Sequence, residues 1–373
     1  MKRLILIISL MLLSSKAMAC SYHTKINFKT SRATWNGDGA FTCGNNTCYQ
    51  ENLKYTYWKP VNENKLRLPK FRFSEDIPKP IRDLVLLKIE KDLLGLPAGV
   101  LENEIVENEA AFATGVDDWF NFAVIYPNDT PYFRALLAYA NLQKDNFRLD
   151  ENKNMYEVLG GNLRLVSFFL DREDLTVDAK ANVLVHEFLH YFLNHSQGDT
   201  VKYDYLFKGS KKRQWVMGKI GESVPIMYPT PALGKAKIMQ EDVAQFREVI
   251  GLPQDKDTTT VSGVVTWNSV LVKAARLTFI NLENPDWTQN VEIDGLRAGD
   301  GSFTVYGLKK GTYEIRLEAV NPMFADLTAW NKFKDKPVNM PTAVFLKNKK
   351  GRKIKFVSDI DKNINLDFRS VEI

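Results

Sequence analysis

The chain has 373 residues, of which 45% are hydrophobic, and its 50 Lys and Arg against 45 Asp and Glu give a formal net charge of +5. Three of those positive charges, on Lys2, Arg3 and Lys16, lie in an N-terminal export signal, so the mature chain keeps only +2. That balance gives no reason to expect a nucleic-acid partner, and roughly 350 mature residues suffice for two or three domains.

Residues 1–19 have the pattern of a secretory signal peptide. Lys2 and Arg3 precede an almost wholly apolar stretch, 4–13, and Ala17-Met18-Ala19 is a small-x-small cleavage site. The apolar stretch is too short for a transmembrane helix, and no later one approaches the roughly 18 apolar residues that would indicate one. We therefore expect an exported protein, either secreted or periplasmic or at the cell surface, without a transmembrane segment.

The three cysteines leave two arrangements open for the N-terminal segment, residues 20–65. Cys20 would be the first mature residue and is a candidate for a lipid anchor, although Ala17 is smaller than the aliphatic residue usual at that place in lipoproteins. Lipidation would leave Cys43 and Cys48 to pair, and in an oxidising compartment this spacing suits a small disulfide loop. Lipid anchoring and simple secretion both remain possible.

Hydrophobic periodicity and stop signals predict alternating strands and helices over residues 66–253. Thr176 is the expected N-cap of the histidine-bearing helix, and Gly95 and Gly251 are expected to end two other helices. The predicted strands are 66–73, 120–126 and 163–170, and the predicted helices are 80–93, 177–194 and 238–250.

The pattern of apolar and turn-forming residues changes after a polar linker, predicted at residues 254–260. Residues 261–373 contain short β-rich runs separated by turn residues and show no helical period, which is typical of a β-sandwich. Within them, 347–353 carries five basic residues and is expected to be a solvated hairpin tip. Binding of an anionic surface polymer by this basic hairpin is a second interpretation.

Three of the four histidines lie within ten residues, at His186, His190 and His195. On a helix, His186 and His190 project from one face and can share a metal ion, and catalytic zinc takes neutral imidazoles while keeping one position open for water. Glu187 can then accept a proton from a water that the metal acidifies. The competing interpretation is a core helix whose histidines are only hydrogen-bonded, which would bury several polar groups at a cost.

Two further segments complete a resemblance to a known family. The motif at 186–190, Pro225-Ile226-Met227-Tyr228-Pro229 and the run 240–243 together look like the matrixin-type metzincins, which are secreted zinc endopeptidases. The resemblance covers residues 66–253 and implies an α+β catalytic domain with a twisted mixed sheet and an active-site helix. It also implies that Zn²⁺ is bound by His186, His190 and His195, with Glu187 as the base.

The same resemblance assigns Met227 to a tight turn beneath the metal, although methionine also fills ordinary core gaps. Tyr228 and Pro229 are expected to line the pocket for the residue after the cleaved bond, and Tyr228 can instead simply pack. The C-terminal segments 300–303 and 308–313 resemble the carboxypeptidase regulatory-like β-sandwich, which implies an all-β accessory domain and no catalysis.

The third ligand departs from the family pattern. His195 follows His186 by nine residues rather than ten, and Leu193 stands where the family has glycine. In an unbroken helix His195 would lie about 180° from His186, so the chain must leave the helix near Leu193 or Asn194. Asn194 is the best candidate, since asparagine tolerates the left-handed conformation.

Two carboxylates compete with His195 for this position, namely Asp199 and Glu222. A zinc-blocking thiolate at Cys43 is a further alternative, but its surroundings do not match the family's latency segment and Cys48 offers a disulfide partner.

These observations predict a secreted zinc endopeptidase that hydrolyses a protein or peptide substrate, with a β-sandwich at its C-terminus. The alternative is a catalytically inactive exported binding protein that uses the sandwich, and a third class holds zinc only for structure.

Overall fold

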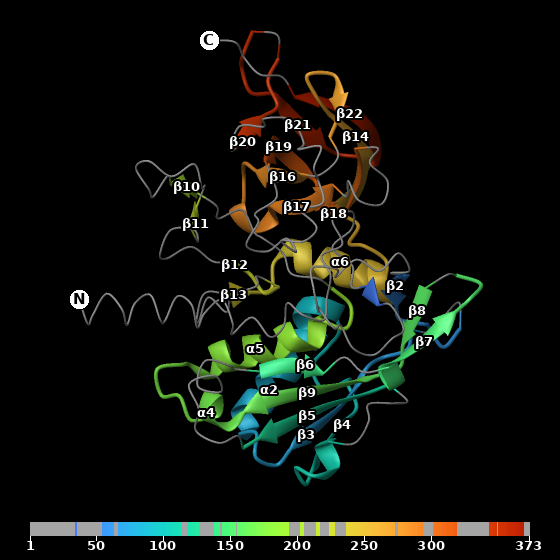
Figure 1. The fold of residues 1–373 in the computed structure, drawn as a ribbon, viewed down its shortest axis with the longest axis vertical. Helices are drawn as coiled ribbons and strands as arrows, with labels where there is room; N and C mark the ends of the chain where they lie inside the picture. The colour runs from blue at the N-terminus through green and yellow to red at the C-terminus, as the bar shows by residue number, and fades with distance from the viewer. Residues whose placement is uncertain are drawn as a thin grey trace, which may run out of the picture.

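The structure is a computed structural model of the chain (Figure 1). It describes fifteen segments, and every structural statement below refers to them. They are residues 34–35, 54–62, 66–112, 118–126, 138–141, 144–153, 155–193, 202–204, 214–216, 224–227, 236–272, 275–293, 301–318, 343–348 and 350–368.

A five-stranded mixed sheet forms the base of the N-terminal part. Its strand order is β4-β3-β5-β9-β6, in which β6 runs antiparallel to its neighbour and the other pairs are parallel. An antiparallel strand therefore lies at one edge of a parallel sheet. The strands are β3 (Lys70–Ser74), β4 (Asn103–Val106), β5 (Trp119–Ile125), β6 (Ala138–Asn141) and β9 (Gly161–Val166).

Two helices, α2 and α5, cover the same face of this sheet, and α6 lies farther from it (Figure 1). Pro80 lies in the first turn of α2, which continues as a π-helix, η2. The helices are α2 (Lys79–Leu87), η2 (Lys88–Leu94), α4 (Ser167–Leu170), α5 (Val177–Leu189) and α6 (Gln240–Ile250).

The predicted caps are confirmed. Thr176 Oγ1 accepts a hydrogen bond from Ala179 N at 3.1 Å, which satisfies one of the first amides of α5. Gly95 and Gly251 adopt left-handed conformations at the ends of η2 and α6.

Three predicted boundaries are wrong. The predicted strand 66–73 begins only at Lys70 and ends at Ser74. The predicted strand 163–170 ends at Val166, where the short helix α4 begins at Ser167. The helix bearing the histidines ends at Leu189 and not at Asn194. Its last turn tightens, because the amides of Tyr191 and Phe192 bond to carbonyls three residues back, Phe188 and Leu189.

Tyr191 explains why the chain turns there. Its hydroxyl donates to the carbonyl of Asn162 at 2.8 Å and accepts from the Asn162 amide at 2.7 Å. The ring lies against Gly161, where a Cβ would come within 2.2 Å of it. Docking of Tyr191 on β9 therefore draws the chain towards the sheet immediately after α5.

Aromatic side chains dominate the core between the sheet and the helices. Phe188 of α5 packs on Phe71 and Phe120, with ring centroids 5.4 and 4.9 Å away. Phe246 of α6 packs on Phe188 and Phe192. These rings tie α5 and α6 to the same core, which we call the mixed-sheet core.

The described segments before residue 258 also contain smaller elements. They are the sheet β1 (Thr34–Trp35), β2 (Lys54–Tyr57), β8 (Met155–Val158) and β7 (Phe147–Asp150), the pairs β10 (Lys202–Asp204) with β11 (Gln214–Val216) and β12 (Val224–Pro225) with β13 (Ala236–Lys237), and the 3-10 turns η3 (Ala110–Phe112) and η4 (Lys144–Asn146). A further 3-10 turn, η5 (Pro285–Trp287), lies between two strands of the C-terminal part.

In the C-terminal part, the described residues between 258 and 368 form two sheets that share a second hydrophobic core. We call it the two-sheet unit. Its first strand begins at Thr258, so the last three residues of the predicted linker belong to that strand. One sheet contains β14 (Thr258–Trp267), β15 (Val270–Leu271), β18 (Ser302–Lys309) and β22 (Lys362–Phe368), and the other contains β16 (Ala275–Asn281), β17 (Gln289–Ile293), β19 (Gly311–Glu318), β20 (Ala343–Phe345) and β21 (Lys355–Ser358).

The basic hairpin lies in this unit. Lys347 and Lys353 form an antiparallel bridge, and both are exposed together with Lys350 and Arg352. Its binding of an anionic polymer stays a prediction.

None of the helices in the described segments combines the length and the apolar character needed to cross a bilayer. The predicted signal peptide, the Cys20 anchor and the Cys43–Cys48 disulfide lie outside the described residues. Export, the metzincin fold and the predicted domain boundaries remain predictions.

Candidate metal centre

The last turn of α5 brings together three polar side chains that the sequence singled out. His186, Glu187 and His190 offer ligand atoms that all lie within 4.8 Å of one another. Glu187 and His190 are 3% and 2% exposed, whereas His186 is partly exposed. In such a buried site, electrostatic interactions are stronger than in water, and each polar atom left without a hydrogen-bond partner costs more free energy.

The two imidazoles face each other through the same nitrogen. Nε2 of His190 lies 3.1 Å from Nε2 of His186, and the rings are nearly perpendicular at 87°. Two nitrogens that each bind zinc at about 2.0–2.1 Å lie about 3.3 Å apart at a tetrahedral angle. The observed spacing fits a shared zinc ion. It also fits a direct hydrogen bond between the rings, so metal binding is a proposal.

The other nitrogen of His186 is held by the backbone. Nδ1 lies 2.6 Å from the carbonyl oxygen of Ile226, which can only accept, so Nδ1 carries the proton. That tautomer leaves the lone pair on Nε2, towards His190. Histidines that bind metals usually have such a carbonyl or carboxylate behind them, because it fixes the ring and raises its basicity.

The segment that supplies this carbonyl, residues 224–227, is held in turn by α6. The Asp242 carboxylate accepts hydrogen bonds from the amides of Ile226, Met227 and Met239, at 3.2, 3.4 and 2.8 Å. Burial, together with the charge of Glu241, raises the pKa of the Asp242 carboxyl to about 7, against the lowering effect of these three amides.

A second helix-borne contact holds the same segment from the other side. Asn182 of α5 donates to the carbonyl of Ala236 at 2.7 Å, and Ala236 pairs in parallel with Val224. The segment is therefore clamped between α5 and α6, and the clamp determines where the Ile226 carbonyl meets His186.

Glu187 is oriented by the edge of the mixed sheet. Its Oε2 accepts a hydrogen bond from the amide of Ala140, in β6, at 2.8 Å. This bond fixes the carboxylate beside the imidazoles.

Met227 lies in the segment that touches His186 and is 1% exposed within the mixed-sheet core. The structure thus brings Met227 near the histidines, in a turn directly after β12. His195 and its competitors Asp199 and Glu222 lie outside the described residues, as do Asn194, Tyr228 and Pro229.

Sequence reasoning singled out the segments 225–229 and 240–243 but gave no role to three contributors, namely the Ile226 carbonyl, the Ala140 amide and the Asp242 carboxylate. The first two are backbone groups and leave no signature in residue type. Asp242 had one usable signal, because an acidic residue in the first turn of a helix complements the helix dipole, but nothing in the sequence indicated its partners.

No protein-family model matches the chain, and neither curated proteins nor solved structures gave a match. The resemblance to metzincins therefore rests on the sequence motifs alone and remains a prediction.

Proposed function

We propose that the chain is an exported zinc-dependent endopeptidase, with His186, His190 and His195 as ligands and Glu187 as the general base. The facing Nε2 atoms, 3.1 Å apart beside a buried carboxylate, are the observation that carries the proposal. Zinc bound there would supply a Lewis acid that acidifies a water and polarises the scissile carbonyl.

Glu187 would accept the proton of the attacking water and later donate it to the leaving amine. The Ala140 amide holds its carboxylate in place through both transfers, because Oε2 is anchored at 2.8 Å. The Ile226 carbonyl keeps His186 in the tautomer that presents Nε2, so the ligand face does not have to reorganise during the reaction.

The edge strand β6 offers a place for the substrate backbone. In the described part of the chain, β6 pairs on one side only, with β9. An extended peptide can add a strand to such an edge through main-chain hydrogen bonds. Because Ala140 of β6 contacts Glu187, a peptide lying along β6 passes beside the proposed base.

Glu187→Gln tests this function directly. Glutamine keeps an oxygen to accept the Ala140 amide but cannot take a proton, so zinc should be retained while hydrolysis of casein or a peptide falls about 100- to 10,000-fold. Glu173→Gln, which alters an exposed carboxylate ahead of α5, is the matched control and should keep full activity.

The outcomes separate the alternatives. Zinc in both proteins with turnover in neither would indicate structural zinc. Equal digests by wild type and Glu187→Gln, with no zinc in either, would favour the non-catalytic binding protein that uses the two-sheet unit.

A further inference from the structure

Helix α6 lies between the mixed-sheet core and the two-sheet unit (Figure 1). Phe246 and Val249 belong to the mixed-sheet core. The opposite side approaches β18 closely, since a Cβ on Gly307 would come within 2.6 Å of the Ala244 Cβ. The helix is thus fixed by both parts of the molecule.

The first turn of α6 carries two adjacent buried carboxylates with different partners. Asp242 holds the amides of Ile226 and Met227, beneath His186. Glu241 points to the two-sheet unit, where its Oε2 accepts from the backbone amide and from the side-chain Nδ2 of Asn290, at 2.9 and 2.8 Å. Consecutive residues of a helix project about 100° apart, so one turn of α6 can contact both the segment 224–227 and the two-sheet unit.

The side chain of Asn290 is held in place by a neighbouring strand. Its Oδ1 accepts a hydrogen bond from Thr278 Oγ1, on the neighbouring strand β16, at 2.8 Å. Asn290 is 4% exposed and Glu241 2% exposed. A buried carboxylate that accepts two donors held by a sheet has little freedom to shift.

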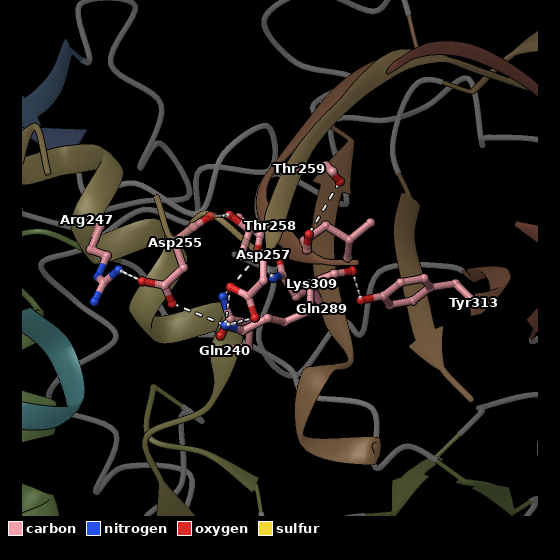
Figure 2. Close-up of polar contacts among 11 residues, drawn as sticks. Gln240, Arg247, Asp255, Asp257, Thr258, Thr259, Gln289, Lys309 and Tyr313 are labelled. Atoms are coloured by element: carbon pink, nitrogen blue, oxygen red, sulfur yellow. Dashed lines mark hydrogen bonds and ion pairs between the residues drawn. The ribbon is translucent and has the colours of Figure 1, made fainter. Parts of the chain in front are cut away.

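The residue before Glu241 makes a parallel contact. Gln240 Nε2 donates to the carbonyl of Gly307, which also accepts from Gln289 Nε2, both at 2.9 Å. Figure 2 shows Gln240 of α6 and Gln289 of β17 close to Lys309. The start of α6 is therefore seated on β17 and β18 by side chains at successive positions.

We infer that Asn290 of the two-sheet unit is a positioning residue for the metal centre. It holds Glu241, which fixes the rotation of the first turn of α6. That rotation places Asp242 under residues 224–227, whose Ile226 carbonyl orients His186. The two-sheet unit is then part of the metal-binding apparatus and not only an appended module. This inference rests on the proposed zinc site.

Zinc affinity, measured by competition with a chromophoric chelator, tests the inference apart from activity. Asn290→Ala and Glu241→Ala should each weaken zinc binding about tenfold, the low end of the range for partners behind metal ligands. Glu241→Gln keeps a carbonyl oxygen that can accept both donors of Asn290, so this conservative variant should retain most of the zinc affinity.

Asn281→Ala is the matched structural control. Asn281 is also 4% exposed and accepts two backbone amides, those of Glu283 and Asn284, but both belong to the two-sheet unit itself. It should lower the free energy of unfolding without altering zinc affinity. Wild-type zinc affinity in both Asn290→Ala and Glu241→Ala would overturn the inference.

A metal-free readout separates this inference from the proposed function. If wild type binds no zinc, the proposed function fails, and ¹⁵N NMR of His186 in the zinc-free protein still reports its tautomer. Asn290→Ala and Glu241→Ala should shift that tautomer towards protonated Nε2, whereas Asn281→Ala should not. An unchanged tautomer in both would contradict the positioning role.

Discussion

Buried polar side chains have different partners in the two-sheet unit and in the part of the molecule built on the mixed-sheet core, which we call the mixed-sheet part. In the two-sheet unit, buried Gln289 and Asn290 turn towards α6 and bond to it or to the strand that supports it. In the mixed-sheet part, buried Glu90 accepts the amides of Gly99, Val100 and Leu101.

Glu187 differs from both cases. One oxygen accepts the Ala140 amide, yet the carboxylate lies beside His186 and His190, whose rings meet at their Nε2 atoms. If the end of α5 served only to fill the core, apolar residues would be expected at these positions, because burying polar groups costs free energy. Burial of a carboxylate is therefore informative about function once the groups that it contacts are known.

Removal of a proposed ligand should have the largest effect. His190→Ala eliminates one of the two facing Nε2 atoms, and we expect zinc affinity to fall by more than the roughly 100-fold upper range for partners behind a ligand. Zinc at 100 times its Kd should stabilise wild type by about 2.7 kcal/mol and should leave the variant unchanged. Chelator competition and thermal unfolding measure both quantities.

A buried glutamate outside the cluster provides the control for His190→Ala. Glu157 pairs with Arg67 and Arg148, so Glu157→Gln should reduce stability and leave zinc affinity intact. Equal zinc affinity in wild type and His190→Ala would show that the two imidazoles only hydrogen-bond to each other.

The next largest effect is expected on removing either of two buried carboxylates, Asp242 and Glu90, which each accept hydrogen bonds from three backbone amides. Asp242→Ala and Glu90→Ala should both lower the free energy of unfolding by about 3 kcal/mol or more, because the donors are left without acceptors. Only Asp242→Ala should also weaken zinc binding, about tenfold, through the Ile226 carbonyl. Urea unfolding and chelator competition on both variants give the answer, and a similar zinc loss in Glu90→Ala would remove the distinction.

The sequence predicted the local parts of this arrangement. The spacing of His186 and His190 placed both rings on one face of a helix, and Thr176 marked where that helix begins. These are contacts between residues a few positions apart, which helical periodicity determines directly.

Contacts between residues far apart in the sequence could not be predicted from it. The bond from Ile226 to His186 spans 40 residues, and that from Asn290 to Glu241 spans 49. The early end of α5 also depends on a distant group, because Tyr191 docks on Asn162 and Gly161 of β9. Packing of this kind overrides the periodicity that predicted a helix to Asn194.

A pH dependence should distinguish Asp242 from exposed carboxylates. Burial and the charge of Glu241 raise its pKa from 3.8 to about 7 in the folded chain. Between these values the folded chain keeps a proton that the unfolded chain has lost, so stability is highest below the lower value and falls as the pH rises towards about 7.

The slope from this group should approach about 1.4 kcal/mol per pH unit in the zinc-free protein. Urea unfolding of wild type and Asp242→Asn across that window isolates it as the difference between the two slopes. Parallel slopes would mean that the carboxylate is ionised throughout, held by its three amides.

The smallest effect is expected where the two parts meet through ion pairs. Lys309 contacts Asp255 at 3.2 Å and Asp257 at 3.0 Å, near the bond from Arg247 to Asp255 (Figure 2). The two aspartates are 38% and 63% exposed, so water screens these pairs and Lys309→Met should change the free energy of unfolding by less than about 1 kcal/mol. Its zinc affinity should equal that of wild type, since neither aspartate touches the first turn of α6. A tenfold loss of zinc affinity in Lys309→Met would show that any weakening of this interface reaches the metal centre, and the specific path through Asn290 and Glu241 would then be wrong.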